Sequence, residues 1–136
     1  MAATASRGIR AIMEAMNDTL VWSATVAGLL VAVAGLASTL ARRRIGLLHL
    51  AGAAVLEVLL LVQAVVAGAA LSGGERPPET ATFLGYLGGV VLLPVAGVLW
   101  SRTEPSRWAG TVLAVASLVT VVMLWRLVQL WEAPGA

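Results

Sequence analysis

The stretch IGLLHLAGAAVLEVLLLVQAVVAGAAL, residues 45–71, decides the fold. It contains one charged residue, Glu57, and Arg42-Arg43-Arg44 comes directly before it. The hydrocarbon core of a bilayer is about 30 Å thick, and a helix needs about 20 mainly apolar residues to cross it. The stretch is long enough and apolar enough to do so, and therefore predicts a transmembrane helix.

Three further apolar stretches occur along the chain, at residues 19–41, 81–100 and 108–131. The breaks between the four stretches hold most of the charged residues, and the last two breaks also hold Pro and Gly. Membrane β-strands would be about 9–11 residues long and would alternate apolar with polar residues, which is not the pattern here. The sequence predicts an all-α protein, a single four-transmembrane-helix bundle with short loops.

The two ends of the chain lie outside these spans. Residues 1–18 are interpreted as an N-terminal tail or as a short interfacial helix, with Met16 as an alternative start, and residues 132–136 as a C-terminal tail. We do not interpret the first segment as a signal peptide, because the apolar run after it is too long and ends in three arginines.

The composition agrees with a membrane protein and excludes several functions. Hydrophobic residues make up 60% and charged residues 12% of the chain, against about 45–50% and about 25% in soluble domains. The absence of cysteine excludes disulfides and thiolate metal sites, and the single histidine excludes a bis-histidine haem within one chain. The net charge of +2 does not indicate nucleic-acid binding. No phosphate-binding loop, metal-ligand cluster or Ser/His/Asp set is present, so we expect no catalytic residue, metal or cofactor, and no enzyme.

The arginines predict the orientation. Loops on the cytoplasmic side carry an excess of basic residues. The first loop holds Arg42-Arg43-Arg44 and the third holds Arg102 and Arg107, whereas the second holds only Arg76. We therefore expect a multi-pass protein of the cytoplasmic membrane with both termini outside. The three arginines of the first loop set this topology and contact anionic lipid in our interpretation.

Helix packing in lipid depends on small residues that allow close approach. Such residues recur at helical spacing on all four spans, which predicts that each span contributes a packing stripe. The stripes, in the order of the four spans, are as follows: in the first, Ala24, Gly28, Ala32 and Gly35; in the second, Gly46, Ala53, Ala64 and Gly68; in the third, Gly85, Gly89 and Ala96; and in the fourth, Gly110, Ala114 and Ser117. Pro94 lies inside the third span and predicts a kink there.

Glu57 is the leading candidate for function. A carboxylate at the bilayer centre costs about 2.5–3.5 kcal/mol on insertion scales, so such residues are functional hypotheses by default. Glu57 shares the small-residue face of its helix, and we expect it to point into the bundle. Two interpretations stay open. The first is a proton- or ligand-binding site made of Glu57 with Tyr86 and Gln63 as further candidates and the kinked third span as a wall, and the second is a protonated Glu that hydrogen-bonds between helices.

The other candidate residues within the spans are Arg126, Gln129, Gln63, Tyr86 and His49. Arg126 lies about 9 Å from the depth of Glu57, and we expect it to reach the outer headgroups beside Gln129 as a polar pair. Gln63 is rotated by about 120° from Glu57 on the helical wheel, and we expect it to bond across helices with Tyr86. His49 is interpreted as an interfacial or lipid-contacting residue.

One resemblance covers most of residues 19–131. The patterns Arg76-Pro77-Pro78-Glu79, Thr82-Phe83-x-Gly85-Tyr86, Pro94, Trp100, Glu104-x-Ser106-Arg107-Trp108 and Arg126-x-x-Gln129-x-Trp131 resemble small uncharacterised integral membrane proteins of actinobacteria. That resemblance implies a host and no activity. The chain is also similar to small multidrug exporters in size and helix count, but their membrane Glu lies in the first helix and Glu57 lies in the second.

Two functions follow as hypotheses. The first is a non-catalytic accessory or assembly component of a larger membrane complex, motivated by the short loops and the small-residue helix faces. The alternative is a small proton-coupled transporter or channel that uses Glu57. Four helices hardly enclose a pathway, so the alternative requires a homo-oligomer.

Overall fold

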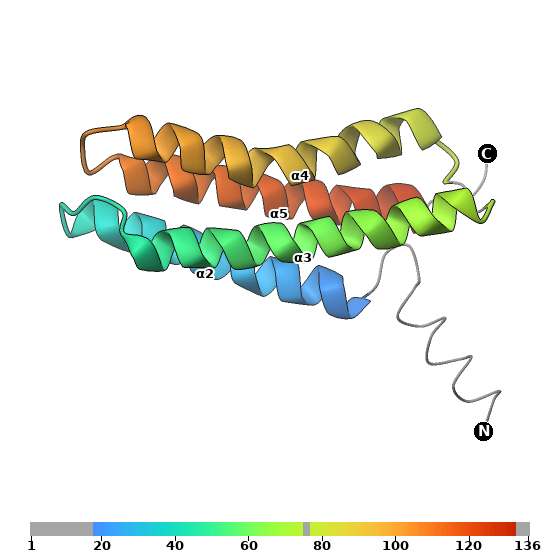
Figure 1. The fold of residues 1–136 in the computed structure, drawn as a ribbon, viewed down its shortest axis with the longest axis horizontal. Coiled ribbons are helices and arrows are strands. Elements are labelled where there is room, and N and C mark those ends of the chain that lie inside the picture. The colour runs from blue at the N-terminus through green and yellow to red at the C-terminus, as the bar shows by residue number, and fades with distance from the viewer. Residues whose placement is uncertain (1–17, 75–76, 133–136) are drawn as a thin grey trace, which may run out of the picture.

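The computed structural model describes residues 18–74 and 77–132, and these residues form four α-helices and no strand (Figure 1). The helices are α2 (Asp18–Leu40), α3 (Leu47–Ser72), α4 (Thr80–Thr103) and α5 (Ala109–Glu132). Each is long and apolar enough to cross a membrane. The predicted all-α, four-helix transmembrane bundle is confirmed. The interpretations of residues 1–17 and 133–136 concern segments outside the described residues.

The helix ends differ from the predicted spans by up to three residues, and hydrogen bonds explain the two largest differences. α3 begins at Leu47 rather than at residue 45, because the backbone N–H of Gly46 donates to Nδ1 of His49 (3.1 Å) and starts the helix there. α4 continues past Trp100 to Thr103, and the Thr103 hydroxyl donates back to the Trp100 carbonyl (2.8 Å). Pro105 then disfavours a helical conformation at Glu104.

Neighbouring helices run antiparallel and form a closed ring of contacts. α2 packs on α3 and α5, and α4 packs on α3 and α5, whereas no two Cα atoms of the diagonal pairs lie within 8 Å of each other in the described residues. The α2–α5 and α4–α5 contacts are the most extensive, and the α3–α4 contact is the least extensive. The loops at residues 41–46 and 104–108 lie at the same end of the bundle (Figure 1). We call this end the arginine end, because Arg42, Arg43, Arg44, Arg102 and Arg107 lie there.

The α2–α3 loop begins with a tight reversal at the arginine end. The N–H of Arg43 donates to the Ser38 carbonyl (2.8 Å) and the N–H of Arg42 to the Thr39 carbonyl (3.1 Å). This is the Schellman pattern of helix termination, which needs one residue in the left-handed region. Arg42 adopts that conformation, with φ of 57°.

Large apolar side chains fill the interior between the helices. The fully buried ones come from α3, α4 and α5, and include Leu56, Leu60, Phe83, Leu124 and Leu127. The outward surface is also apolar, with Leu30 and Val33 each 65% exposed and Leu92 66% exposed. An apolar surface of this extent is suited to lipid and not to water. The chain is therefore an integral membrane protein of the multi-pass type.

The predicted packing stripes are right throughout for α2 and α5 and right only in part for α3 and α4, where Ala53 is buried and Gly89 contacts a neighbouring helix. All members of the α2 and α5 stripes are buried. On α3, a β-carbon placed on Gly46 or Gly68 would meet nothing within 4 Å, and on α4 the same holds for Gly85. The close contacts on α4 are made by Gly89, where an added β-carbon would lie 2.6 Å from Met123 Cε, and by Gly97, where it would lie 2.6 Å from Ala116 Cβ.

Candidate functional site

Glu57 lies in the wall of a groove between α3 and α4. The groove has a volume of about 350 Å³. α3 contributes Leu50, Ala53, Ala54 and Glu57, and α4 contributes Pro94, Val95, Val98, Leu99 and Arg102. We call this the Glu57 groove. It forms between the two helices with the least extensive contact, so it opens sideways toward lipid.

The carboxyl group of Glu57 is not satisfied inside the chain. Its Oε2 atom is buried and has no hydrogen-bond partner. Arg102 lines the same groove, but the structure has no ion pair between the two residues. Glu57 lies seven residues along α3 from Leu50, or about 10 Å at the rise of an α-helix. The groove thus holds a polar group deep in the membrane and a guanidinium at the arginine end.

The sequence predicts that Glu57 points into the bundle, and the structure differs. The adjacent Leu56 is 1% exposed and takes the interior position, whereas Glu57 is half-buried at the side. The reason is that the buried face of α3 runs through Ala53, Leu56 and Leu60, so Glu57 lies at the edge of that face. Glu57 therefore lies beside the interior, with the residue partly exposed and its Oε2 atom covered.

Pro94 forms part of the α4 wall of the groove. It is buried inside the helix, and its ring nitrogen cannot donate the hydrogen bond that the Val90 carbonyl would otherwise accept. The ribbon of α4 bends near its middle (Figure 1), as expected for a helix with an interior proline. The bend lies opposite α3, where the groove has formed.

The other two predicted site residues do not line this groove. Gln63 is 1% exposed and lies inside the bundle. Tyr86 is half-buried against the apolar core that includes Phe83 and Leu87. Glu57, Gln63 and Tyr86 therefore do not form one pocket, and the chemistry of the groove rests on Glu57 and Arg102.

Arg126 and Gln129 lie on the exposed surface of α5. Nη1 of Arg126 donates to Oε1 of Gln129 at 3.1 Å. This pair lies toward the end opposite the arginine end and has no contact with the Glu57 groove. It is an intrahelical polar pair of the kind expected from the sequence.

At the arginine end, the two loops are joined by one hydrogen bond. Nη2 of Arg44 donates to the Glu104 carbonyl at 3.4 Å. Arg42 and Arg43 are exposed. The carboxylate of Glu104 accepts from the hydroxyl and the N–H of Ser106 (2.8 and 3.3 Å). The described part of this end has five arginines and one glutamate, Glu104. The formal charge of these side chains therefore sums to +4.

His49 is a structural residue that the sequence interpretation missed. Its Nδ1 accepts from the Gly46 N–H, so its Nε2 carries the proton and donates to the Ala34 carbonyl of α2 at 3.0 Å. The side chain is half-buried and joins the start of α3 to α2. Its position three residues after a glycine at a helix start is the available signal, because side chains at that position reach back to the cap.

Within the described residues, no group of three His, Asp or Glu side chains converges in a way that could hold a metal. Comparison of the chain with family models, with curated proteins and with solved structures finds no match. The functional argument therefore rests on the geometry of this chain.

Proposed function

We propose that this protein is a non-catalytic accessory or assembly component of a membrane complex, and that a transmembrane helix of its partner occupies the Glu57 groove. In this proposal the protein lies in the cytoplasmic membrane with the arginine end in the cytoplasm. The observation that carries the proposal is the buried Oε2 atom of Glu57, which has no hydrogen-bond partner in a groove that opens toward lipid.

Lipid chains do not satisfy a carboxyl group. A polar group without a partner in hydrocarbon costs several kcal/mol, about 2–7 depending on the reference state. A partner helix that presents a hydrogen-bond donor or a cation at the depth of Glu57 removes that cost on assembly. Intramembrane carboxylates commonly pair in this way.

The groove also has the shape that a helix needs. Its α3 wall has the small residues Ala53 and Ala54 next to Glu57, and small residues let a second backbone come close. The interior of the bundle is closed by Leu56, Leu60 and Phe83. The groove therefore offers an external docking surface and no passage through a single chain.

The test is site-specific photo-crosslinking in native membranes. A photoreactive residue replaces Ala54, which lines the Glu57 groove, and in a control it replaces Ala69, which is exposed on α3 outside the groove. We expect a single crosslinked protein from position 54 and none from position 69. We also expect that Glu57→Leu reduces recovery of the intact stoichiometric complex about tenfold, as loss of one charge-assisted hydrogen bond would.

The identity of the crosslinked product decides between the candidates. A different membrane protein supports the accessory role. Crosslinking to lipid alone, with a complex unaffected by Glu57→Leu, would refute it. Crosslinking to a second copy of this chain would instead favour the alternative function.

That alternative is a proton-coupled transporter or channel formed by several copies. One observation favours it: the same groove contains a mid-membrane carboxyl group and extends to Arg102 at the arginine end. A pathway would have to form between copies, because apolar side chains fill the interior of one chain. Under this function, Glu57→Gln abolishes proton-linked flux in reconstituted vesicles while the protein remains folded, and unchanged flux would eliminate it.

A further inference from the structure

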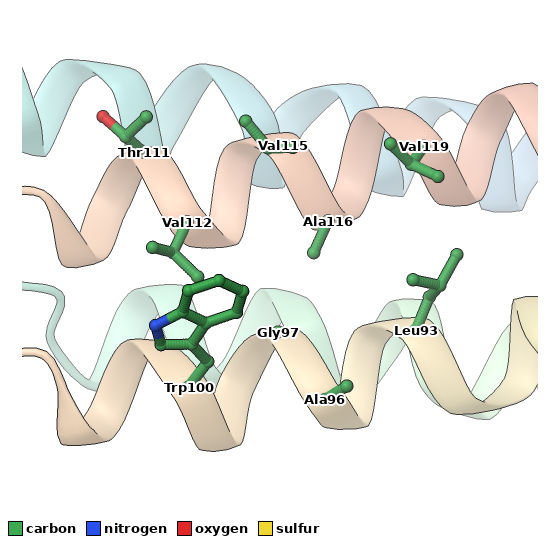
Figure 2. A pocket seen from close by; sticks show the side chains of 9 residues that line it. All are labelled: Leu93, Ala96, Gly97, Trp100, Thr111, Val112, Val115, Ala116 and Val119. Carbon is green, nitrogen blue, oxygen red and sulfur yellow. The ribbon is translucent and has the colours of Figure 1, made fainter.

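A second groove lies on the other side of α4, against α5 (Figure 2). Its volume is about 410 Å³. The walls are apolar apart from Thr111, whose hydroxyl is already hydrogen-bonded to Thr39 Oγ1 at 2.9 Å. Gly97 and Ala116 bring the two backbones together at its floor. We call this the α4–α5 groove.

The α4–α5 groove occupies only half of the membrane. It runs from Trp100 and Thr111 at the arginine end to Leu93 and Val119. Seven or eight residues of helix rise correspond to about 10–12 Å, whereas half of the hydrocarbon core is about 15 Å. The groove therefore lies within the length of one leaflet, which a single acyl chain of that leaflet can follow.

The end of this groove carries groups that suit a lipid headgroup. Trp100 lies at the arginine end of the groove, and its indole nitrogen lies on the side nearest the α4–α5 loop (Figure 2). Tryptophan commonly occupies this depth, with its ring in the apolar region and its N–H toward the headgroups. Arg107 lies in the turn just before α5, four residues before Thr111, and the N–H of Gly110 donates to its carbonyl, so Arg107 is at the same end of the bundle as Trp100 and Thr111.

The guanidinium of Arg107 lies over the ring of the neighbouring Trp108. Its Cζ lies 5.0 Å from the centroid of the Trp108 ring. Stacking uses the face of the guanidinium and leaves its in-plane N–H donors available, and these match a phosphate group. The nearest loop carboxylate, Glu104, is instead hydrogen-bonded to Ser106.

We propose that the α4–α5 groove binds one acyl chain of an anionic phospholipid, with its phosphate on Arg107 beside Trp100. The excess of arginine at this end selects an anionic over a zwitterionic lipid. The site is on a different face of α4 from the Glu57 groove and is independent of the proposed partner helix.

The experiment is lipid retention by the full chain. The protein is reconstituted in nanodiscs with equal amounts of phosphatidylglycerol and phosphatidylcholine, then released into mild detergent, and the bound lipids are counted by native mass spectrometry. We expect one retained phosphatidylglycerol per chain, in about fivefold preference over phosphatidylcholine, from about 1 kcal/mol per arginine near the surface. High salt should lower the preference, since exposed charges are screened.

Two variants with matched controls test the two halves of the site. Arg107→Gln should remove the preference for phosphatidylglycerol, and Arg126→Gln, at the opposite end, should not. Ala96→Phe should obstruct the groove and lower retention of both lipids, whereas Ala69→Phe, on the exposed surface of α3, should not. Equal retention of the two lipids by the unmodified chain, or full retention by Ala96→Phe, would overturn the proposal.

Discussion

The α2–α5 and α3–α4 interfaces are built in opposite ways. Between α2 and α5, the backbones of Gly35 and Gly110 meet directly, and the Thr39 hydroxyl bonds to Thr111 Oγ1 (2.9 Å) and to the Arg107 carbonyl (3.1 Å). Between α3 and α4 the contact is the least extensive of the four, and the buried Oε2 of Glu57 has no hydrogen-bond partner. One interface satisfies its polar groups internally, and the other does not.

This difference divides the bundle into a closed side and an open side. In lipid there is no hydrophobic drive between helices, so close packing and satisfied hydrogen bonds hold α2 on α5. The α3–α4 side lacks both, and it is the side where a further helix gains most by binding. Three substitutions test this comparison.

Gly35→Val on the closed side is expected to cause the largest change in the free energy of unfolding, a loss. A β-carbon at Gly35 would meet the Gly110 carbonyl, and backbone atoms do not move aside cheaply. Overpacking typically lowers the free energy of unfolding by about 1–3 kcal/mol. We expect Gly35→Val to lower it by about 3 kcal/mol or more. The matched control is Gly85→Val on α4, where nothing lies within 4 Å, and its unfolding midpoint in denaturing detergent should be close to that of the unmodified protein. Equal losses in the two variants would contradict the assignment of the closed side.

Glu57→Leu on the open side is expected to raise the free energy of unfolding, by less than Gly35→Val lowers it. Replacing a carboxyl group that lacks a partner removes a desolvation cost, so the isolated chain should gain about 1 kcal/mol of unfolding free energy. Leu56→Ala, one residue away and 1% exposed, should instead lose about 2–5 kcal/mol. If Glu57→Leu were as destabilising as Leu56→Ala, the carboxyl group would be serving the fold and not a partner.

The smallest effect is expected from Thr25→Val, again on the closed side. The Trp125 indole N–H donates to Thr25 Oγ1 at 2.9 Å, and this bond links α5 to α2. Interhelical hydrogen bonds in membrane proteins contribute about 0.6 kcal/mol on average, and we expect a loss of that size in detergent unfolding. Thr19→Val, at an exposed position of α2, serves as the reference. A loss of unfolding free energy above about 2 kcal/mol would contradict the assignment of this bond as an ordinary interhelical hydrogen bond.

The spans could be predicted from the sequence because two quantities determine them. Bilayer thickness sets how many apolar residues a helix needs, and charged residues stay out of the hydrocarbon region. Residues 45–71 and their three counterparts meet the first condition, and the only charged residues inside them are Glu57 and Arg126, so their ends agree closely with the four helices. The gathering of five arginines at one end follows from the same pattern, since alternate loops of antiparallel helices lie on the same side.

The placement of Glu57, Gln63 and His49 was decided by the tertiary structure. Small residues recur on all four spans, so sequence spacing alone cannot tell which stripes meet. Among the described residues, the predicted stripes of α2 and α5 bring two backbones together, at Gly35 and Gly110, whereas Gly89 and Gly97 of α4 approach side chains of α5. Leu56 consequently fills the interior while Glu57 faces the groove, and His49 reaches the Ala34 carbonyl. Hydropathy and length fix which segments cross the membrane, whereas the fit of helix surfaces in three dimensions determines which side chains are left for a partner.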